Sequence, residues 1–269
     1  MPQTLYEYGG TGSIIHVAIA NGFPPPTYKP LVQPLTSRYR VVSLPPRPLW
    51  SDPPPPKSVN SWRSLADDLL AGLRQYNLTD VIAVGHSFGG VGSLVAITLE
   101  PSRFRGLVLL DPTIFTPFRL RLVAIARLLG LMARYPLVQG ALRRRAKFAS
   151  VDEAYTYWRG KRLFKDWSDE VLRLYAESMT RPTPDGNGVE LTWSPQWEAH
   201  YYSLFMTETW RYIRKLPKSL PVLAVRGGET ETFLAPAAEK LRQVLPQAEY
   251  VEIAGHGHLF PQSAPDETR

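Results

Sequence analysis

The sequence predicts an α/β protein with a mostly parallel sheet, helices on both faces and one long helical insertion. Short apolar segments alternate with helical segments over residues 4–111, and this alternation builds a parallel sheet covered on both sides. One apolar segment ends in Gly-x-Ser-x-Gly and leads at once into a helical run. The alternation stops after Asp111 and resumes near residue 218. We therefore expect residues 1–111 and 218–269 to form the core, and residues 112–217 to form a helical cap.

The individual elements follow from hydrophobic periodicity and from the glycines and prolines that interrupt it. The helix expected at 61–76, for example, carries Leu65, Leu69, Leu70 and Leu73 at helical spacing. Strands are expected at 4–8, 13–19, 40–44, 81–84, 105–110, 221–226 and 249–253. Core helices are expected at 28–35, 61–76, 91–99 and 236–244.

Composition narrows the class of protein. A chain of 269 residues fits one large α/β domain or one domain with an insertion. It has no cysteine, which excludes disulfides and thiolate metal sites. The N-terminus shows no secretory signal, and Arg127 and Arg134 interrupt the best candidate for a membrane-spanning run. We expect a cytoplasmic protein with no nucleic-acid partner and no stable membrane insertion; composition gives no oligomeric state.

Residues 81–90 contain the motif around which the chain is organised. Four apolar residues are followed by Gly85-His86-Ser87-Phe88-Gly89-Gly90, the order of strand, tight turn and helix that is typical of a nucleophile elbow. Such a turn strains the backbone of the serine, so its neighbours must be small, and Gly85 and Gly89 supply that room. The simpler interpretation is a glycine-rich turn with Ser87 as a helix N-cap. The flanking strand and helix favour a nucleophile.

Two further groups of polar residues follow predicted strands. Gly227-Gly228-Glu229-Thr230-Glu231 follows one strand, and Gly255-His256-Gly257-His258 follows the last. In parallel sheets, reactive groups gather beyond the carboxyl ends of the strands, where Ser87 also lies. A serine hydroxyl needs a base to take its proton and an acid to orient that base. All three residue types therefore lie where such chemistry needs them.

On these motifs the sequence resembles the α/β-hydrolase superfamily over nearly its whole length. The order serine, acid, histidine is the order of that fold, and residues 255–261, Gly-His-Gly-His-Leu-Phe-Pro, match its terminal motif. Many members carry a helical cap where residues 112–217 are inserted. The resemblance implies an α/β-hydrolase fold without a metal or an organic cofactor. Epoxide hydrolases and haloalkane dehalogenases of this fold place Asp where Ser87 stands, so their activities are disfavoured.

The resemblance also selects candidates for the base and the acid. The family pattern Gly-x-Gly-His-apolar selects His258 as the base and leaves His256 at the rim. Arg-Gly-x-x-Ser-Asp in the family matches residues 226–231, with Thr for Ser and Glu for Asp, which ranks Glu231 first as the acid. Asp111, at the end of the preceding strand, ranks second, and Glu229 ranks third. Each could instead be a solvated loop carboxylate, or a helix cap in the case of Asp111.

By the same resemblance, the backbone N–H groups of Phe23 and Phe88 form an oxyanion hole. Asn21-Gly22-Phe23-Pro24 stands where members typically show His-Gly-x-Pro, although these residues also form plain turns. We expect Asn21, His86 and Trp197 to line the substrate pocket. Most of the many aromatic residues between 158 and 212 should pack the cap's own core.

Residues 119–134 should form a basic amphipathic helix in the cap. At about 100° per residue, Arg119, Arg127 and Arg134 fall on one side, and leucines cover much of the rest. No acidic residue occurs between Thr113 and Val151. We expect the arginines to face water; the alternative is a lid that rests on anionic lipid or accepts an acidic substrate.

Together these features predict a serine hydrolase that cleaves small to medium, mainly apolar carboxylic esters. The small-molecule ester would be its only required partner. Acyl transfer, lactone opening and carbon–carbon hydrolysis could use the same triad. A non-catalytic ligand-binding protein on the same fold is the alternative from a different class.

Overall fold

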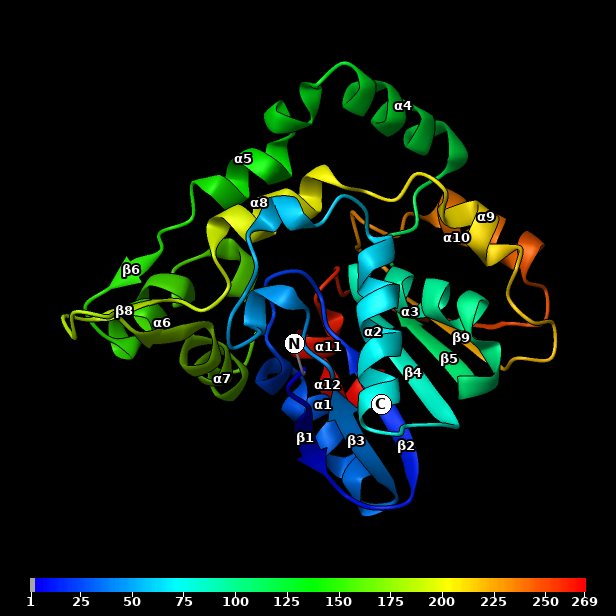
Figure 1. The fold of residues 1–269 in the computed structure, drawn as a ribbon, viewed down its shortest axis with the longest axis horizontal. Helices are drawn as coiled ribbons and strands as arrows, with labels where there is room; N and C mark the ends of the chain where they lie inside the picture. The colour runs from blue at the N-terminus through cyan, green and yellow to red at the C-terminus, as the bar shows by residue number, and fades with distance from the viewer. Residues whose placement is uncertain (1–2) are drawn as a thin grey trace.

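The computed structural model describes residues 3–269, and its centre is a seven-stranded sheet (Figure 1). The strand order is β1-β3-β2-β4-β5-β9-β10, with β1 antiparallel to β3 and all other neighbours parallel. The strands are β1 (Tyr6–Gly9), β2 (Ser13–Ala18), β3 (Tyr39–Ser43), β4 (Val81–His86), β5 (Phe104–Leu110), β9 (Val222–Gly227) and β10 (Glu249–Ile253). The predicted mostly parallel sheet is confirmed. The strand that ends at Ser87 lies at its middle.

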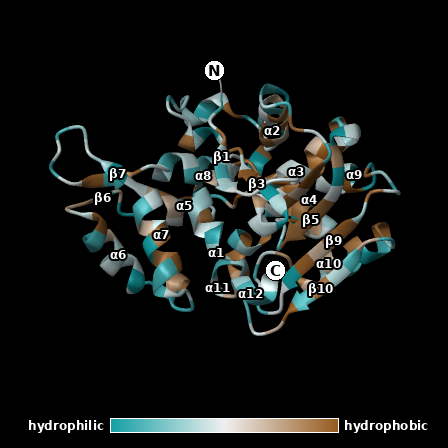
Figure 2. Ribbon diagram, turned by 90° about the horizontal axis from the view of Figure 1, so that it is seen from below, coloured by the Kyte–Doolittle hydropathy of each residue, from teal (hydrophilic) through white to brown (hydrophobic). Residues whose placement is uncertain are grey.

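Helices cover both faces of this sheet. Viewed from below in Figure 2, α2 and α3 lie above the strands, and α1 and α12 lie beneath them. The same view colours the central strands as hydrophobic, in keeping with buried parallel strands. The core helices are α1 (Lys29–Val32), α2 (Arg63–Gln75), α3 (Phe88–Leu99), α10 (Ala235–Val244), α11 (Phe260–Ser263) and α12 (Pro265–Thr268).

The helix expected at 28–35 is shorter than predicted. Only Lys29–Val32 is α-helical, between the 3-10 turns η1 (Pro25–Tyr28) and η2 (Gln33–Ser37). Pro30 and Pro34 each stand in the first turn of a new segment. A proline has no N–H to donate, so it starts a helical turn easily and cannot continue one.

The segment between β5 and β9 contributes no strand to the large sheet. It contains a small antiparallel sheet of order β6-β8-β7, with β6 (Lys147–Phe148), β7 (Thr180–Pro182) and β8 (Val189–Leu191). Its helices are α4 (Pro117–Leu128), α5 (Pro136–Leu142), α6 (Val151–Arg159), α7 (Asp169–Met179), α8 (Pro195–Ser203) and α9 (Thr209–Ile213).

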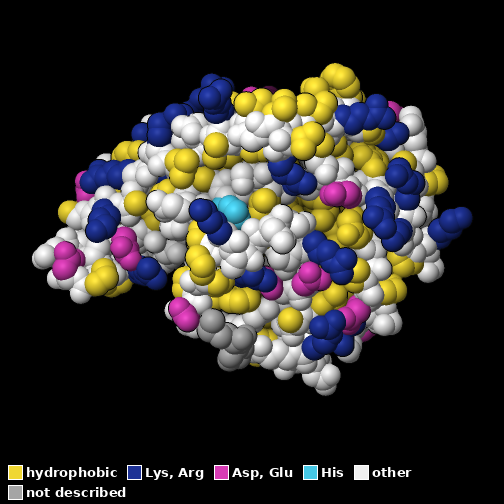
Figure 3. All heavy atoms as spheres, turned by 45° about the horizontal axis from the view of Figure 1, so that its top comes forward, with side chains coloured by type: hydrophobic (Ala, Val, Ile, Leu, Met, Phe, Trp, Pro, Cys, Tyr) yellow, Lys and Arg dark blue, Asp and Glu magenta, His cyan; other side chains and the backbone are white. Residues whose placement is uncertain are grey.

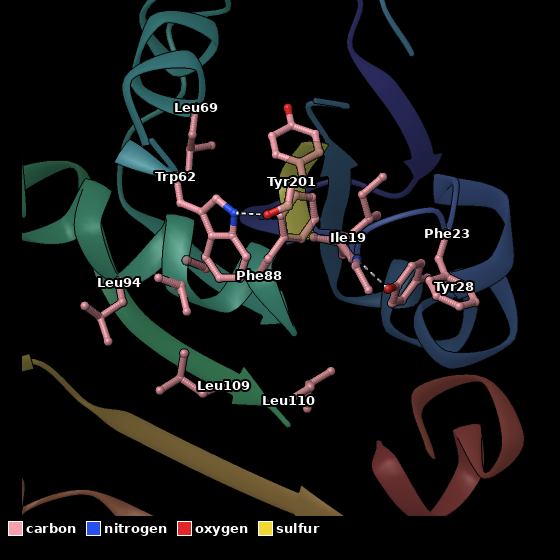
Figure 4. Close-up of a cluster of buried hydrophobic side chains, with 14 of the residues drawn as sticks. Ile19, Phe23, Tyr28, Trp62, Leu69, Phe88, Leu94, Leu109, Leu110 and Tyr201 are labelled. Carbon is pink, nitrogen blue, oxygen red and sulfur yellow. Dashed lines mark hydrogen bonds between the residues drawn. The ribbon is translucent and has the colours of Figure 1, made fainter. Parts of the chain in front are cut away.

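Buried aromatic side chains join this segment to the sheet domain. The Trp62 indole N–H donates to the backbone oxygen of Tyr201, 2.8 Å away. The Trp210 indole N–H donates to the Phe115 backbone oxygen, and this bond lies within the inserted segment. Figure 4 shows the ring of Phe88, the residue after Ser87, between Trp62 and Tyr201. The elbow is therefore covered by apolar rings from both parts of the chain.

The helix expected at 119–134 ends earlier than predicted. It is α-helical from Pro117 to Leu128, ends at Gly130 with φ of 67°, and continues as a 3-10 turn. Of its three arginines, Arg127 and Arg134 are exposed as expected, and only Arg119 is not. Arg119 is half-buried, with its guanidinium 4.1 Å from the centre of the Phe115 ring, and Arg127 donates to the Phe205 backbone oxygen. The side of α4 that faces water is mainly apolar. Within residues 3–269, no helix is both long and apolar enough to cross a membrane.

Candidate active site

Ser87 lies in a strained turn between β4 and α3. Its backbone has φ of 58° and ψ of −123°, which is rare for a residue with a side chain. The turn is possible because its neighbours are glycines. A Cβ on Gly89 would lie 2.5 Å from the Ala18 backbone oxygen, and one on Gly85 would lie 2.4 Å from the Cα of Gly90. The side chain of Ser87 is thereby held above the end of the sheet.

A line of hydrogen bonds runs from Ser87 through His258 to Asp111. The Ser87 hydroxyl lies 3.0 Å from Nε2 of His258, and His258 Nδ1 lies 2.6 Å from Oδ2 of Asp111. A base that receives the serine proton at one nitrogen must carry its own proton on the other, where a carboxylate can hold it. The arrangement can therefore activate the Ser87 hydroxyl and stabilise the imidazolium that forms.

Asp111 is fixed by its surroundings as well as by His258. It is fully buried and follows β5 with φ of 41°. Its Oδ1 accepts a hydrogen bond from the Gly227 backbone N–H at 3.0 Å, and its Oδ2 accepts one from the Thr230 hydroxyl. A buried carboxylate needs such donors in place of water. The end of β9 thus supplies the groups that hold an acid from the neighbouring strand.

The carboxylate beside His258 is therefore not the one that the sequence ranks first. Glu231 is exposed, and among the described residues its carboxylate forms no hydrogen bond with His258. Glu229 is exposed as well. The loop after β9 turns so that Thr230 faces inward while Glu229 and Glu231 face water. Asp111, our second candidate, occupies the position instead.

His86 is buried and hydrogen-bonded to the backbone of His258. We expected it to line the substrate pocket, and it does not. It is 1% exposed, and its Nε2–H donates to the His258 backbone oxygen at 2.9 Å. Its Nδ1 accepts from the Tyr28 hydroxyl at 2.7 Å, and that hydroxyl accepts from the Ala20 N–H. Burial lowers the pKa of His86 well below its usual 6.5, and the charge of His258 lowers it further. His86 is therefore a neutral link between the loop at residues 20–23 and the loop of His258.

Thr113 is a site residue that the sequence analysis missed. Its hydroxyl lies 3.1 Å from Ser87 Oγ, and its backbone N–H donates to the Ser87 backbone oxygen. Because the Ser87 hydroxyl points its proton at His258, the Thr113 hydroxyl is the donor in this contact. The segment after Asp111 therefore contacts Ser87 through both a side chain and the backbone. Its only sequence signal is its place two residues after the strand end.

The two backbone amides expected at the oxyanion hole differ in whether they already donate a hydrogen bond. Phe88 is the first residue of α3, and such N–H groups have no acceptor within their helix. The Phe23 N–H donates to the Ala20 backbone oxygen at 3.2 Å, which closes a turn with Gly22 at φ of 83°. Only the Phe88 amide therefore lies open in this conformation.

The other expected pocket residues, Asn21 and Trp197, are both buried. The Asn21 amide donates to the Glu198 backbone oxygen at 3.1 Å, and its own oxygen is buried without a partner among the described residues. Trp197 is 4% exposed and packs against Tyr201. His256 is half-buried, and its Nδ1 lies 3.4 Å from the Ser263 hydroxyl. Asn21 is thus held by α8, and Trp197 is packed within α8 itself.

A partly buried ion pair lies beside the same loop. Arg144 pairs with the Glu198 carboxylate and donates to the Tyr175 hydroxyl at 2.8 Å. A Cβ on Gly22 would lie 3.3 Å from the Glu198 carboxylate and 3.4 Å from the Arg144 guanidinium. The pair therefore contacts the turn that carries Phe23.

The comparison with known proteins identifies the family of this chain. A family model described as the alpha/beta hydrolase family matches residues 15–269. None of the curated proteins matches the sequence significantly.

Solved structures of similar fold cover nearly the whole chain. An E-2-(acetamidomethylene)succinate hydrolase superposes with a TM-score of 0.78 at 22% identity, covering 98% of this chain and 91% of that one. A thioesterase domain from the curacin biosynthetic pathway gives 0.74 at 16% identity, covering 98% and 92%. An esterase of M. tuberculosis gives 0.73 at 18% identity, covering 98% and 85%. At these identities the likeness is one of fold.

Proposed function

Because this chain belongs to the alpha/beta hydrolase family, we propose that it is a serine hydrolase that cleaves carboxylic esters through an acyl-enzyme on Ser87. The observation that carries the proposal is the line of hydrogen bonds from Ser87 through His258 to the buried Asp111. These are the residue types and contacts of a Ser-His-Asp catalytic triad, in which the histidine takes the serine proton and the carboxylate stabilises the resulting imidazolium. The family itself includes hydrolases of several substrate classes, and an ester is the class that this arrangement serves most simply.

In the proposed reaction, Ser87 Oγ attacks the ester carbonyl while His258 Nε2 takes the hydroxyl proton. The tetrahedral intermediate collapses when His258 returns that proton to the leaving alcohol, which leaves an acyl group on Ser87. Water then repeats the sequence and releases the acid. Asp111 stays ionised and stabilises the imidazolium at each step.

The Phe88 N–H is the first donor of the proposed oxyanion hole, with the Phe23 N–H as the second. A main-chain donor of this kind lowers the barrier by about 3 kcal/mol. The Phe23 amide must share or release its turn hydrogen bond to Ala20 to reach the oxyanion. We infer small to medium, mainly apolar substrates because the rings of Phe23, Trp167 and Tyr175 pack together beside this turn.

A serine-directed fluorophosphonate tests the proposal. We expect it to label Ser87 alone, and we expect Ser87→Ala to lose both labelling and ester hydrolysis, by about 10⁶-fold in kcat. Ser93→Ala is the matched control, because Ser93 is a buried serine further along the same helix. It should keep both. Retained hydrolysis in a folded Ser87→Ala protein, or labelling at another residue, rules the proposal out.

A further inference from the structure

The outer side of α4 is an apolar surface, which we call the α4 face: Phe118, Leu122, Ile125, Leu128 and Leu129. These side chains are 69, 51, 53, 87 and 64% exposed. Their spacing places them along one side of the helix, the stripe that a globular protein normally turns toward a core. Of the eleven large hydrophobic side chains that are exposed in the described chain, eight lie between 118 and 142. A surface of this kind marks an interaction site.

The orientation of α4 is set by packing on its other side. Leu120 and Val123 are buried, and Arg119 lies over the Phe115 ring. The Thr116 hydroxyl caps the helix by accepting from the Arg119 N–H. The α4 face therefore cannot be buried by rolling the helix over, because this would expose Leu120 and Val123.

The α4 face is surrounded by positive charge. There is no acidic residue between Thr113 and Val151. Arg121, Arg127, Arg134 and Arg143 are exposed, and none of them forms an ion pair within residues 3–269. Figure 3 shows hydrophobic side chains along the upper edge of the molecule, with Lys and Arg side chains on either side.

We propose that the α4 face docks the protein peripherally on an anionic lipid surface. Lipid acyl chains would receive the leucines while headgroups neutralise the arginines, the arrangement that holds amphipathic helices in a membrane interface. A second copy of this chain fits less well, because it would bring two sets of unpaired arginines together. Arg127 and Arg134 face water as we expected, but the apolar side chains of the α4 face are exposed beside them.

Co-sedimentation with vesicles tests the proposal. We expect binding to phosphatidylcholine vesicles that contain about 30% phosphatidylglycerol, and weak binding to pure phosphatidylcholine. Raising salt from about 0.05 to 0.5 M should weaken the binding, because it screens the arginines from the headgroups. Failure to bind the anionic vesicles, or equal and salt-independent binding to both kinds, overturns the proposal.

Matched variants locate the binding surface. Leu122→Gln and Leu128→Gln should each lower the vesicle partition coefficient by about ten-fold, and Arg121→Gln by about five-fold. Leu163→Gln is the control, because Leu163 is 58% exposed but lies outside the α4 face. It should bind as the unaltered protein does. Equal losses in Leu163→Gln and Leu128→Gln contradict the assignment.

The absence of cysteine allows a direct measure of depth. Ile125→Cys, labelled with an environment-sensitive fluorophore, should shift to the blue on anionic vesicles, and labelled Leu163→Cys should not. Light scattering on the protein without vesicles tests whether a second copy of this chain binds the α4 face instead. A concentration-dependent dimer that Leu128→Gln abolishes would assign the α4 face to a second copy and overturn the lipid proposal.

Discussion

Asp111 differs from Glu231 in what each carboxylate can reach. Asp111 is fully buried and accepts hydrogen bonds from His258, Thr230 and the Gly227 backbone N–H. Glu231 is exposed to water. A carboxylate orients an imidazole only if its own position is fixed, and Thr230 acts here as a positioning residue for Asp111. Its hydroxyl also accepts from the Thr232 N–H, which ties the loop to itself.

Asp111→Asn should therefore lower kcat by about 10⁴-fold with a smaller change in KM, because the imidazolium formed during attack loses its charge partner. Steady-state kinetics on a chromogenic ester measure the effect. Since Asp111 is buried, a thermal melt must show that the variant is folded.

Glu231→Gln and Glu229→Gln are the controls for that experiment. Both residues are exposed, so both variants should keep nearly full activity. If Glu231→Gln lost activity while folded Asp111→Asn kept it, the acid would come from the loop after β9 and the assignment to Asp111 would be wrong.

At the scale of elements, an ion pair connects two parts of the inserted segment. Arg144 lies two residues after the end of α5, and Glu198 lies in α8. The two side chains are only 18% and 11% exposed, and the Tyr175 hydroxyl on α7 accepts a hydrogen bond from Arg144. Gly22 lies against both charges. Removing one partner from such a pair leaves the other charge partly buried and unpaired, which costs more than the pair itself contributes.

We expect Glu198→Leu alone to lower the free energy of unfolding by about 3 kcal/mol, and the double variant Arg144→Met with Glu198→Leu to lose clearly less. Urea denaturation of both variants and of Arg144→Met gives the coupling energy. If the double variant lost the sum of the two single losses, the charges would not be coupled. Arg145 and Glu153, a more exposed pair, provide the comparison and should couple by less than about 1 kcal/mol.

At the scale of the whole molecule, one apolar cluster runs through both the large sheet and the segment inserted between β5 and β9. Two histidines, His16 on β2 and His86 on β4, are enclosed by it, each 1% exposed. His16 Nε2 accepts from the Leu44 N–H at 3.0 Å, so the ring must be neutral at that nitrogen. Burial lowers the pKa of His16 to about 3.

Stability should consequently fall as the pH falls below about 6.5, the pKa of histidine in the unfolded chain. Between there and about pH 3 the unfolded chain binds the His16 proton and the folded protein does not, so acid favours unfolding. His16→Gln should reduce the slope of unfolding free energy against pH by up to about 1.4 kcal/mol per pH unit in that window. Urea titrations of His16→Gln and of the unaltered protein between pH 4 and 7 measure the two slopes.

By itself, the sequence determined the features that are encoded locally. The order of strand, Gly-x-Ser-x-Gly and helix occupies some twenty consecutive residues, so the parallel sheet and the turn at Ser87 could be predicted from it. The same holds for the position of His258 just beyond the last strand.

Only the tertiary structure decided the partner of His258 and the outward side of α4. Which carboxylate meets the imidazole depends on how the ends of β5 and β9 lie relative to the loop after β10, and β5 is more than a hundred residues away from both β9 and β10 in the sequence. Which side of an amphipathic helix is buried depends on what its neighbours offer, and here they cover Leu120 and Val123 and leave the α4 face to the solvent.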